Sequence, residues 1–201
     1  MPKLLPATRD ERRLQILNAA RACVDEHGLE AVSMEMIIAA SGLSVGTVYR
    51  YFAGKDDIIS AAVLGGTTGL AEALAPVLGQ DDPPPPGEYI GQVLRAIVSY
   101  GSRGPVDLTR VALHGWSHSR TDAGLRAAVE SVQRGARSQF AATCRRWQAA
   151  GVLGADADPD AVAELLLSVT LGFVAQRSLA GGASIEAHAA AVTALLRAPE
   201  R

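Results

Sequence analysis

A chain of 201 residues can form one large domain or two small ones. Its 48% hydrophobic content excludes a disordered protein, and because only 4% of the residues are aromatic, the core must consist mainly of Ala, Leu and Val. The formal net charge is -2. The first 57 residues carry seven Lys or Arg against eight Asp or Glu, so no general basic excess draws this chain to a polyanion.

The first part of the chain predicts four helices from the spacing of apolar residues and from their end signals. Gly28 ends the first helix, Ser33 and Ser44 are good N-caps for the next two, and Gly54 precedes the fourth. A turn at 41–43 separates the second helix from the third. The predicted segments are a loose arm at 1–8 and helices at 9–27, 34–40, 45–52 and 55–78.

A linker with four consecutive prolines follows at 79–87, and we expect it to be extended because proline does not continue a helix. Helical patterns then resume and continue to the end of the chain. Asp158 and Pro159 form an N-cap followed by proline at the first helical position. These predicted helices cover 88–102, 106–119, 122–150, 159–179 and 185 to about 197, and no segment predicts a strand.

The segment 33–55 holds two short helices joined by a tight turn with glycine, which is typical of a DNA-binding helix-turn-helix. At 100° per residue, Val48 and Phe52 share the core side of the second of these helices. The predicted outer side carries Gly46, Thr47, Arg50 and Tyr51. The ring of Tyr49 would pack beside the core with its hydroxyl pointing outward.

These residue types fit a DNA groove. Gly46 allows close backbone approach, Thr47 can contact a phosphate or a thymine methyl, and Arg50 can bind a guanine edge or a phosphate. Lys55 begins a helix, where its charge and the helix dipole both attract phosphate. From local features alone, an ordinary exposed face of a three-helix subdomain explains the segment equally well. The predicted DNA-binding residues are Ser44, Gly46, Thr47, Tyr49, Arg50, Tyr51 and Lys55.

The run from Arg13 to Gly28, the pair at 32–33 and the run from Ser41 to Ile59 resemble the N-terminal domain of the TetR family of bacterial regulators. The block from Thr47 to Phe52, followed by Lys55, is the most specific part. The resemblance implies that the third helix enters the major groove of DNA. It also implies that positions matching Thr47, Tyr49, Tyr51 and Lys55 contact DNA, and that an all-helical second half forms a homodimer around a small-molecule pocket.

The second helix departs from the family pattern at two places. Glu35 stands near the start of the second helix, where the family often has a basic residue, and Ile37-Ile38 replaces an Ile-Ala pair. A carboxylate facing a phosphate would repel it. We therefore expect Glu35 either to turn away from DNA or to accept a hydrogen bond from a cytosine amino group, and we favour the first.

The helix after Pro159 is apolar on nearly all sides, so other helices must cover it. Together with the last helix it predicts a four-helix dimer interface, although both helices could equally be core of a monomer. The family resemblance favours the dimer, because two DNA-binding domains match the two half-sites of a two-fold symmetric operator. The predicted interface residues are Val162, Leu166, Val169, Phe173, Val192 and Leu196.

Aromatic residues of the second half could line an apolar ligand pocket, although aromatics at helical positions are more often plain core. The predicted ligand-binding residues are Tyr100, His114, Trp116, Phe140 and Phe173. His114 and His118 stand four residues apart, a spacing that can hold a metal. No nearby carboxylate or cysteine completes that site convincingly, so we expect no metal and keep metal sensing as an alternative.

The sequence therefore predicts an all-α protein of about nine helices, with a helix-turn-helix DNA-binding domain at 1–54 and an effector-binding and dimerisation domain at 55–201. We expect a repressor released from a palindromic operator by a small apolar molecule. The alternatives are a metal-responsive regulator, a small enzyme or a dimeric interaction module. No phosphate loop, nucleophile elbow or carboxylate pair indicates catalysis, and we expect no cofactor. The most apolar stretch, 165–175, is too short for a membrane span, so we expect a cytoplasmic protein.

Overall fold

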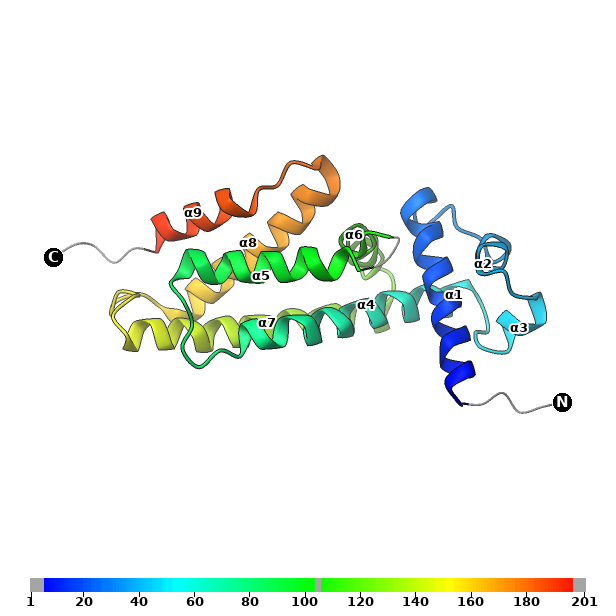
Figure 1. Ribbon diagram of the computed structural model, residues 1–201, viewed down its shortest axis with the longest axis horizontal. Coiled ribbons are helices and arrows are strands. Elements are labelled where there is room, and N and C mark those ends of the chain that lie inside the picture. Colours follow the sequence, from blue (N-terminus) through cyan, green and yellow to red (C-terminus); the bar gives the residue numbers. More distant parts are fainter. Residues whose placement is uncertain (1–5, 104–105, 197–201) are drawn as a thin grey trace.

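The computed structural model describes residues 6–103 and 106–196, and within them every regular element is a helix. This confirms the all-α class and the predicted number of helices. Figure 1 shows an elongated molecule with α2 and α3 at one end, α1 crossing near them, and α4, α5 and α7 running along the long axis. The helices are α1 (Pro6–His27), α2 (Met34–Ser41), α3 (Val45–Tyr49), α4 (Lys55–Leu78), α5 (Pro86–Gly101), α6 (Leu108–His118), α7 (Ala123–Ala149), α8 (Pro159–Ala180) and α9 (Ile185–Leu195).

Polar N-caps and glycine ends fix the helix boundaries largely as predicted. The side chains of Ser33, Ser44 and Asp158 each accept a hydrogen bond from a backbone N–H in the first turn of their helices. Gly42 follows α2 with φ 66°, a left-handed conformation that glycine adopts without steric cost. Its N–H donates to the carbonyl of Ala39, so the chain turns sharply there and places α3 across the end of α2.

Several boundaries differ from the prediction: α6 begins two residues later than predicted, at Leu108, and the differences at α1, α3 and α5 have a clear local cause. Helix α1 begins at Pro6, inside the predicted arm, because proline is well suited to the first turn of a helix. For the same reason α5 begins at Pro86, so the predicted linker is two residues too long. Helix α3 ends at Tyr49 and not at Phe52, since the N–H groups of Arg50 and Tyr51 donate to carbonyls three residues back. The end of the last predicted helix, at residue 197, lies outside the described residues.

Two hydrophobic cores share α4. The first packs α1, α2 and α3 through Ile16, Ile37 and Val48, and the first turns of α4 add Ile58 and Ile59 to it. The far end of α4 contributes to the second core, which α5, α7, α8 and α9 complete. The N-terminal core therefore continues past residue 54, and α4 is a rigid element common to both halves of the chain.

The second core is built around a buried aromatic group. Tyr89 packs edge-on against Phe140 and Trp147, with ring centroids 6.2 and 5.3 Å apart. The Tyr89 hydroxyl pairs with that of Thr143 at 3.1 Å, and the indole N–H of Trp147 donates to the carbonyl of Pro84 at 3.0 Å. Every polar tip in this group thus has a partner, and the proline-rich segment is held against the bundle.

Two of the described helices, α4 and α8, are long and apolar enough to cross a membrane by length and composition alone. The sequence argument considered only residues 165–175, and that reason was wrong because the whole of α8 is longer. In the structure α4 packs against α1, α5, α6 and α7, and α8 packs against α5, α6 and α7. Such packing is that of core helices, which pass the same composition test.

Candidate nucleic-acid interface and apolar cavity

Helix α3 is fixed in place by a buried residue on one side and a serine cap at its start. Val48 is fully buried against the N-terminal core. The Ser44 side chain accepts from the backbone N–H of Thr47 at 3.3 Å, and the two hydroxyls share a hydrogen bond of 2.8 Å. One helix face is therefore anchored, and the opposite face is held at a defined orientation toward solvent.

The outward face of α3 and the residue after it offer small and polar groups to solvent. Gly46 and Arg50 are exposed, and Tyr49 is 51% exposed. No carboxylate of the described residues pairs with Arg50, whose guanidinium carbon lies 5.9 Å from the centre of the Tyr51 ring. A Cβ added at Gly46 would meet nothing within 4 Å, so packing within the chain does not require glycine there.

The two tyrosines have the opposite roles to those predicted. Tyr51 is half-buried against the N-terminal core, whereas Tyr49 is the exposed one. The reason is the early end of α3, because the helical spacing used for the prediction does not apply beyond Tyr49. Tyr49 is therefore the more exposed of the two phenols, and DNA contact by either tyrosine stays a prediction.

Lys55, at the first position of α4, lies beside this face but already has a partner. Its ammonium group donates to the carbonyl of Val32 at 2.8 Å and so ties α4 to the segment before α2. An ammonium group has three N–H donors, and this contact uses one. The remaining two are free to reach a phosphate.

Glu35 is exposed in the first turn of α2. The Ser33 hydroxyl and, more weakly, the backbone N–H of Glu35 donate to its carboxylate, and these bonds lower the pKa of that carboxyl below its ordinary value. The carboxylate thus serves the N-terminus of its own helix, where a negative charge is favourable. The expectation that Glu35 turns away from bound DNA stays a prediction.

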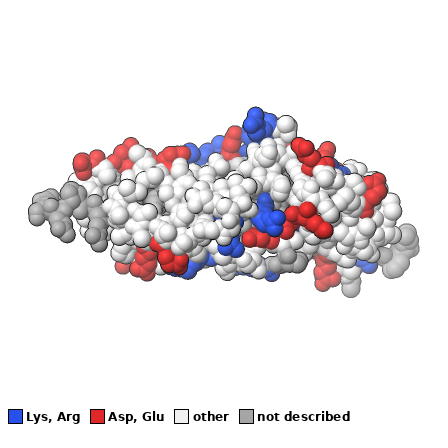
Figure 2. Space-filling model, turned by 90° about the horizontal axis from the view of Figure 1, so that it is seen from above, with Lys and Arg blue, Asp and Glu red and all other residues white. Residues whose placement is uncertain are grey.

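Charge on the molecular surface is mixed. On the face drawn in Figure 2, acidic and basic side chains are interspersed and no continuous basic patch is visible. This agrees with the even balance of charges in the sequence. The face drawn in Figure 2 therefore offers no general attraction to a polyanion, and recognition there would depend on individual groups.

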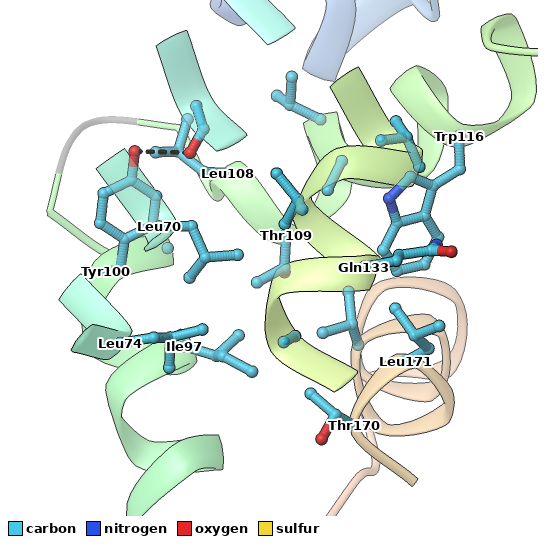
Figure 3. Close-up of a pocket in the computed structure, with 18 of the residues that line it drawn as sticks. Leu70, Leu74, Ile97, Tyr100, Leu108, Thr109, Trp116, Gln133, Thr170 and Leu171 are labelled. Carbon is cyan, nitrogen blue, oxygen red and sulfur yellow. Dashed lines mark hydrogen bonds between the residues drawn. The ribbon is translucent and has the colours of Figure 1, made fainter. Parts of the chain in front are cut away.

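A cavity of about 130 Å³ lies in the C-terminal half, between α4, α5, α6, α7 and α8 (Figure 3). Its wall is almost entirely apolar. The small residues Ala62, Gly66, Ala112 and Ala136 leave the space that larger side chains would fill. The other lining residues are Val63, Leu70, Leu74, Ile97, Tyr100, Gly101, Leu108, Thr109, Val111, Trp116, Val129, Val132, Gln133, Leu167, Thr170, Leu171 and Val174.

Most polar groups on the cavity wall are engaged within the protein. The Tyr100 hydroxyl donates to the carbonyl of Gly66 at 2.9 Å, that of Thr170 to the carbonyl of Leu166, and that of Thr109 to the carboxylate of Asp107. Within the described residues, the amide of Gln133 and the indole N–H of Trp116 have no hydrogen-bond partner. Figure 3 shows these two side chains together, at the end of the cavity opposite Tyr100.

Of the predicted ligand-binding residues, only Tyr100 and Trp116 line this cavity. Phe140 and Phe173 are fully buried in the second core, where neighbouring side chains occupy the space around them. His114 faces the N-terminal half, since a Cβ added at Gly28 would lie 3.9 Å from its Cε1. The small residues of α4, α6 and α7 carry no sequence signal for a cavity, so the prediction missed them.

Three of the predicted interface residues, Leu166, Phe173 and Val192, are buried inside the single chain and belong to its own core. They cannot contact a second copy without unpacking that core. Val162, Val169 and Leu196 are half-buried, and they remain candidates for an interface. Large apolar side chains are also exposed on α8 and α9, namely Leu165, Leu179 and Leu195.

Three polar contacts join the helix-turn-helix end to the bundle. The guanidinium of Arg21 on α1 donates twice to the carbonyl of Ala62 on α4, at 3.3 and 3.0 Å, and its burial lowers its pKa. Asp25 pairs with Arg110 of α6 at 3.0 Å. Ser60 donates to the carboxylate of Asp122, which caps α7. Helices that border the cavity are thus tied directly to α1.

Two family models match the chain. Residues 16–62 match that of the bacterial regulatory proteins of the tetR family, and residues 86–198 match the C-terminal region of BetI-type transcriptional repressors. The second match alone covers more than half of the chain. The chain belongs to the TetR family. Its described helices α1 to α3 form the family's N-terminal helix-turn-helix region, which the resemblance in the sequence predicted correctly.

Curated relatives in the TetR family match over the N-terminal part. The transcriptional regulator BetI 2 of Chromohalobacter salexigens is 31% identical over 83 residues, which is 41% of this chain and 40% of that protein. The regulator UidR of Escherichia coli is 40% identical over 52 residues, or 26% of each chain. These matches span well under half of the relatives' length.

Solved structures share the fold over nearly the whole chain. Salmonella enterica GusR has a TM-score of 0.71 with 23% identity and covers 97% of both chains. A transcriptional regulator from Saccharomonospora viridis, in complex with choline, has a TM-score of 0.75 with 22% identity over 92% of this chain and 95% of that one. SmeT bound to triclosan has a TM-score of 0.72 with 23% identity, over 92% and 90%. At these identities the likeness concerns the fold of the TetR family.

Proposed function

We propose that this member of the TetR family is a transcriptional repressor that binds a palindromic operator as a homodimer and is released by a small molecule. The outward face of α3 reads the DNA, and the cavity between α4 and α8 receives an apolar part of the effector. The observation that carries the proposal is the contrast at α3, where Val48 is buried while Gly46, Tyr49 and the following Arg50 are exposed, and within the described residues Tyr49 and Arg50 form no side-chain hydrogen bond or ion pair.

Gly46 supports DNA reading independently. A glycine inside a helix costs about 1 kcal/mol relative to alanine, yet an alanine side chain at this position would meet open space. The chain therefore gains nothing internally from glycine at this site. Close approach of a partner's backbone to α3 accounts for it, and Arg50 and Tyr49 on the same face supply a forked donor and a phenol.

The cavity supports a response to a small molecule. Protein interiors are close-packed, and an apolar space of about 130 Å³ leaves unrealised the contact free energy that a packed core would gain. A bound apolar group would recover that free energy. Because Ala62 on the cavity wall accepts the hydrogen bonds of Arg21, a ligand that displaces α4 also shifts α1 and with it the reading helix.

The lining favours an apolar group over a quaternary ammonium such as the choline bound by the Saccharomonospora viridis protein. No carboxylate lies among the described lining residues, and the two aromatic side chains, Tyr100 and Trp116, stand at opposite ends of the cavity (Figure 3). An aromatic cage needs rings that face one common centre. The wall is closer in character to what an aromatic molecule such as triclosan, bound by SmeT, requires.

We place the dimer contact on α8 and α9. Leu179 and Leu195 are 80% and 69% exposed, and Leu165, Val162 and Val169 add apolar surface along α8. A second copy would cover this surface and give two α3 helices related by two-fold symmetry, as a palindromic operator demands.

A repressor that acts on chromosomal DNA works in the cytoplasm.

The alternatives have no supporting observation. Among the residues that the structure describes, no group of three or more His, Cys, Asp or Glu side chains is placed to hold a metal, and His114 and His118 stand without a third ligand. The proposal therefore assigns no metal, no cofactor and no catalytic residue to the chain. An interaction module without DNA binding would leave the free groups of α3 unexplained.

A mobility-shift titration with the DNA upstream of its own gene tests the DNA-binding part. Arg50→Ala should weaken operator binding about 10- to 100-fold, the value of one forked contact to a base, and Thr47→Ala should weaken it less. Arg134→Ala on α7 is the matched control, because Arg134 is exposed and lies far along the chain from α3. Equal affinities for the wild type and the Arg50 variant would refute the assignment of α3.

A further inference from the structure

A second hollow, of about 540 Å³, lies directly outside the apolar cavity, where α6 turns into α7. Trp116, Val129 and Gln133 line both spaces, so these side chains lie where the inner cavity adjoins the outer hollow. The outer hollow is lined further by Ser119, Arg120, Arg126 and Glu130. The two spaces differ sharply in chemistry, because the inner one holds no charged residue and the outer one holds three.

Of the two arginines that line the outer hollow, Arg126 is engaged within the protein and Arg120 has no ion pair among the described residues. Arg126 donates to the carbonyls of Ser119 and Arg120, at 3.0 and 2.6 Å, and so holds the turn between α6 and α7. No acidic side chain of the described residues pairs with the guanidinium of Arg120, and Glu130 likewise forms no ion pair there. Two arginines against one glutamate give this hollow a net positive charge, beside the unpartnered amide of Gln133.

The size of the inner cavity limits what it can hold. A closed apolar cavity of about 150 Å³ binds benzene, whereas sites for drug-sized ligands measure about 300 to 1,000 Å³. At about 130 Å³, the inner cavity therefore accepts one small apolar group and not a whole effector of ordinary size. The remainder of such an effector has to pass Trp116 and Gln133 and lie in the outer hollow.

We propose that the effector is a small amphipathic anion. Its apolar group, about the size of a benzene ring, fills the inner cavity, and its carboxylate lies in the outer hollow against Arg120, with the Gln133 amide as a further donor. This rests on the proposed effector-binding function and adds the chemical class of the effector. Arg120 is then the residue that selects an anion over a neutral or cationic molecule of the same shape.

Calorimetric titration of the full-length protein with three probes of one shape tests this assignment. Phenylbutyrate, phenylbutanol and phenylbutylamine share the apolar part and differ only in the charge at the end of the chain. The acid should bind about fivefold more tightly than the alcohol, the usual upper value of an exposed ion pair, and the amine should bind most weakly. Arg120→Gln should remove the preference for the acid and leave the alcohol unchanged.

Arg134→Gln is the matched control, since it removes the same charge from an exposed position of α7 that lines neither space. It should keep the full preference for the acid. Equal binding of acid and alcohol, tighter binding of the amine, an equal loss in both arginine variants, or no binding of any probe would each overturn the proposal. The proposed repressor function would survive the first three results, because the alcohol would still bind and operator affinity is measured separately.

Discussion

The two halves of the molecule use helices of similar composition for opposite purposes. At the N-terminal end, α1, the two short helices α2 and α3 and the start of α4 close around Ile16, Ile37 and Val48, and the groups available to a partner point outward. In the C-terminal half, five longer helices meet around an apolar space, and the groups available to a partner point inward. The first arrangement suits a large polar partner, and the second suits a small apolar one.

The difference lies in where close packing is given up. The N-terminal core is closely packed, and unfilled space next to it occurs only at the surface, for example beside Gly46. The C-terminal half gives up packing itself, because alanines and glycines of α4, α6 and α7 face one another where a core would place leucines. The cavity and the outward face of α3 are connected through α4, which contributes residues to both cores.

The sharpest test of this contrast is to create a void where the C-terminal half is fully packed. Phe173 is completely buried among α5, α8 and α9 and lies edge-on to His188, with ring centroids 5.3 Å apart. Phe173→Ala should lower the free energy of unfolding by about 3–5 kcal/mol, measured by urea titration at a fixed protein concentration. Arg134→Ala, at an exposed position of α7 outside the proposed dimer contact, should change it by less than about 0.5 kcal/mol.

A small loss in the Phe173 variant would mean that this residue borders loose space, like the wall of the cavity. In that case the assignment of Phe173 to a ligand site would regain support. A large loss together with unchanged binding of apolar ligands would separate the packed core from the cavity, as the structure places them.

A second test adds a single methyl group at two glycines. A Cβ at Gly115 on α6 would lie 2.8 Å from Cγ1 of Val63, a buried residue of α4 on the cavity wall, whereas a Cβ at Gly135 on α7 would meet nothing within 4 Å. Gly115→Ala should therefore destabilise the protein by about 1–2 kcal/mol and weaken ligand binding, since Val63 must move toward the cavity. Gly135→Ala should stabilise it by about 0.5–1 kcal/mol.

Thermal and urea unfolding of both variants, with ligand titrations alongside, measure these effects. If Gly115→Ala raised stability as Gly135→Ala does, the close contact between α4 and α6 would be wrong. The route from the cavity to the reading face through α4 would then lose its structural basis.

The outcome of the sequence predictions follows the same division. Caps and periodicity act within a few residues, so Ser33, Ser44 and Gly42 marked α2 and α3 correctly. The exchange of Tyr49 and Tyr51 arose because one helix ended a turn early, which periodicity alone does not reveal. The cavity depends on how five helices meet, and alanines such as Ala112 and Ala136 look like ordinary helix formers in the sequence. The large aromatic residues Phe140 and Phe173, which the sequence predicted to bind a ligand, are buried in the second core instead.

The smallest expected effect concerns Asp107, the N-cap of α6, whose carboxylate pairs with Arg177 of α8. Burial alone would raise the pKa of this carboxyl, but the hydroxyl and N–H of Thr109 and the Arg177 guanidinium outweigh it, so the pKa lies below its ordinary value of 3.8. A carboxyl with a lowered folded-state pKa stabilises the protein above its unfolded-state pKa. That contribution is lost as the pH falls through the folded-state pKa.

The unfolding free energy of the wild type should therefore fall as the pH drops below about 4. Asp107→Asn keeps an N-cap for α6 but loses the charge that pairs with Arg177 of α8, so it should cost less than about 1 kcal/mol at neutral pH and give a shallower acid decline. Asp82→Asn, at an exposed position of the proline-rich segment, should follow the wild type. Urea titrations across this range decide the matter, because a full acid decline in the Asp107→Asn protein would show that Asp107 contributes no pH-dependent link between α6 and α8.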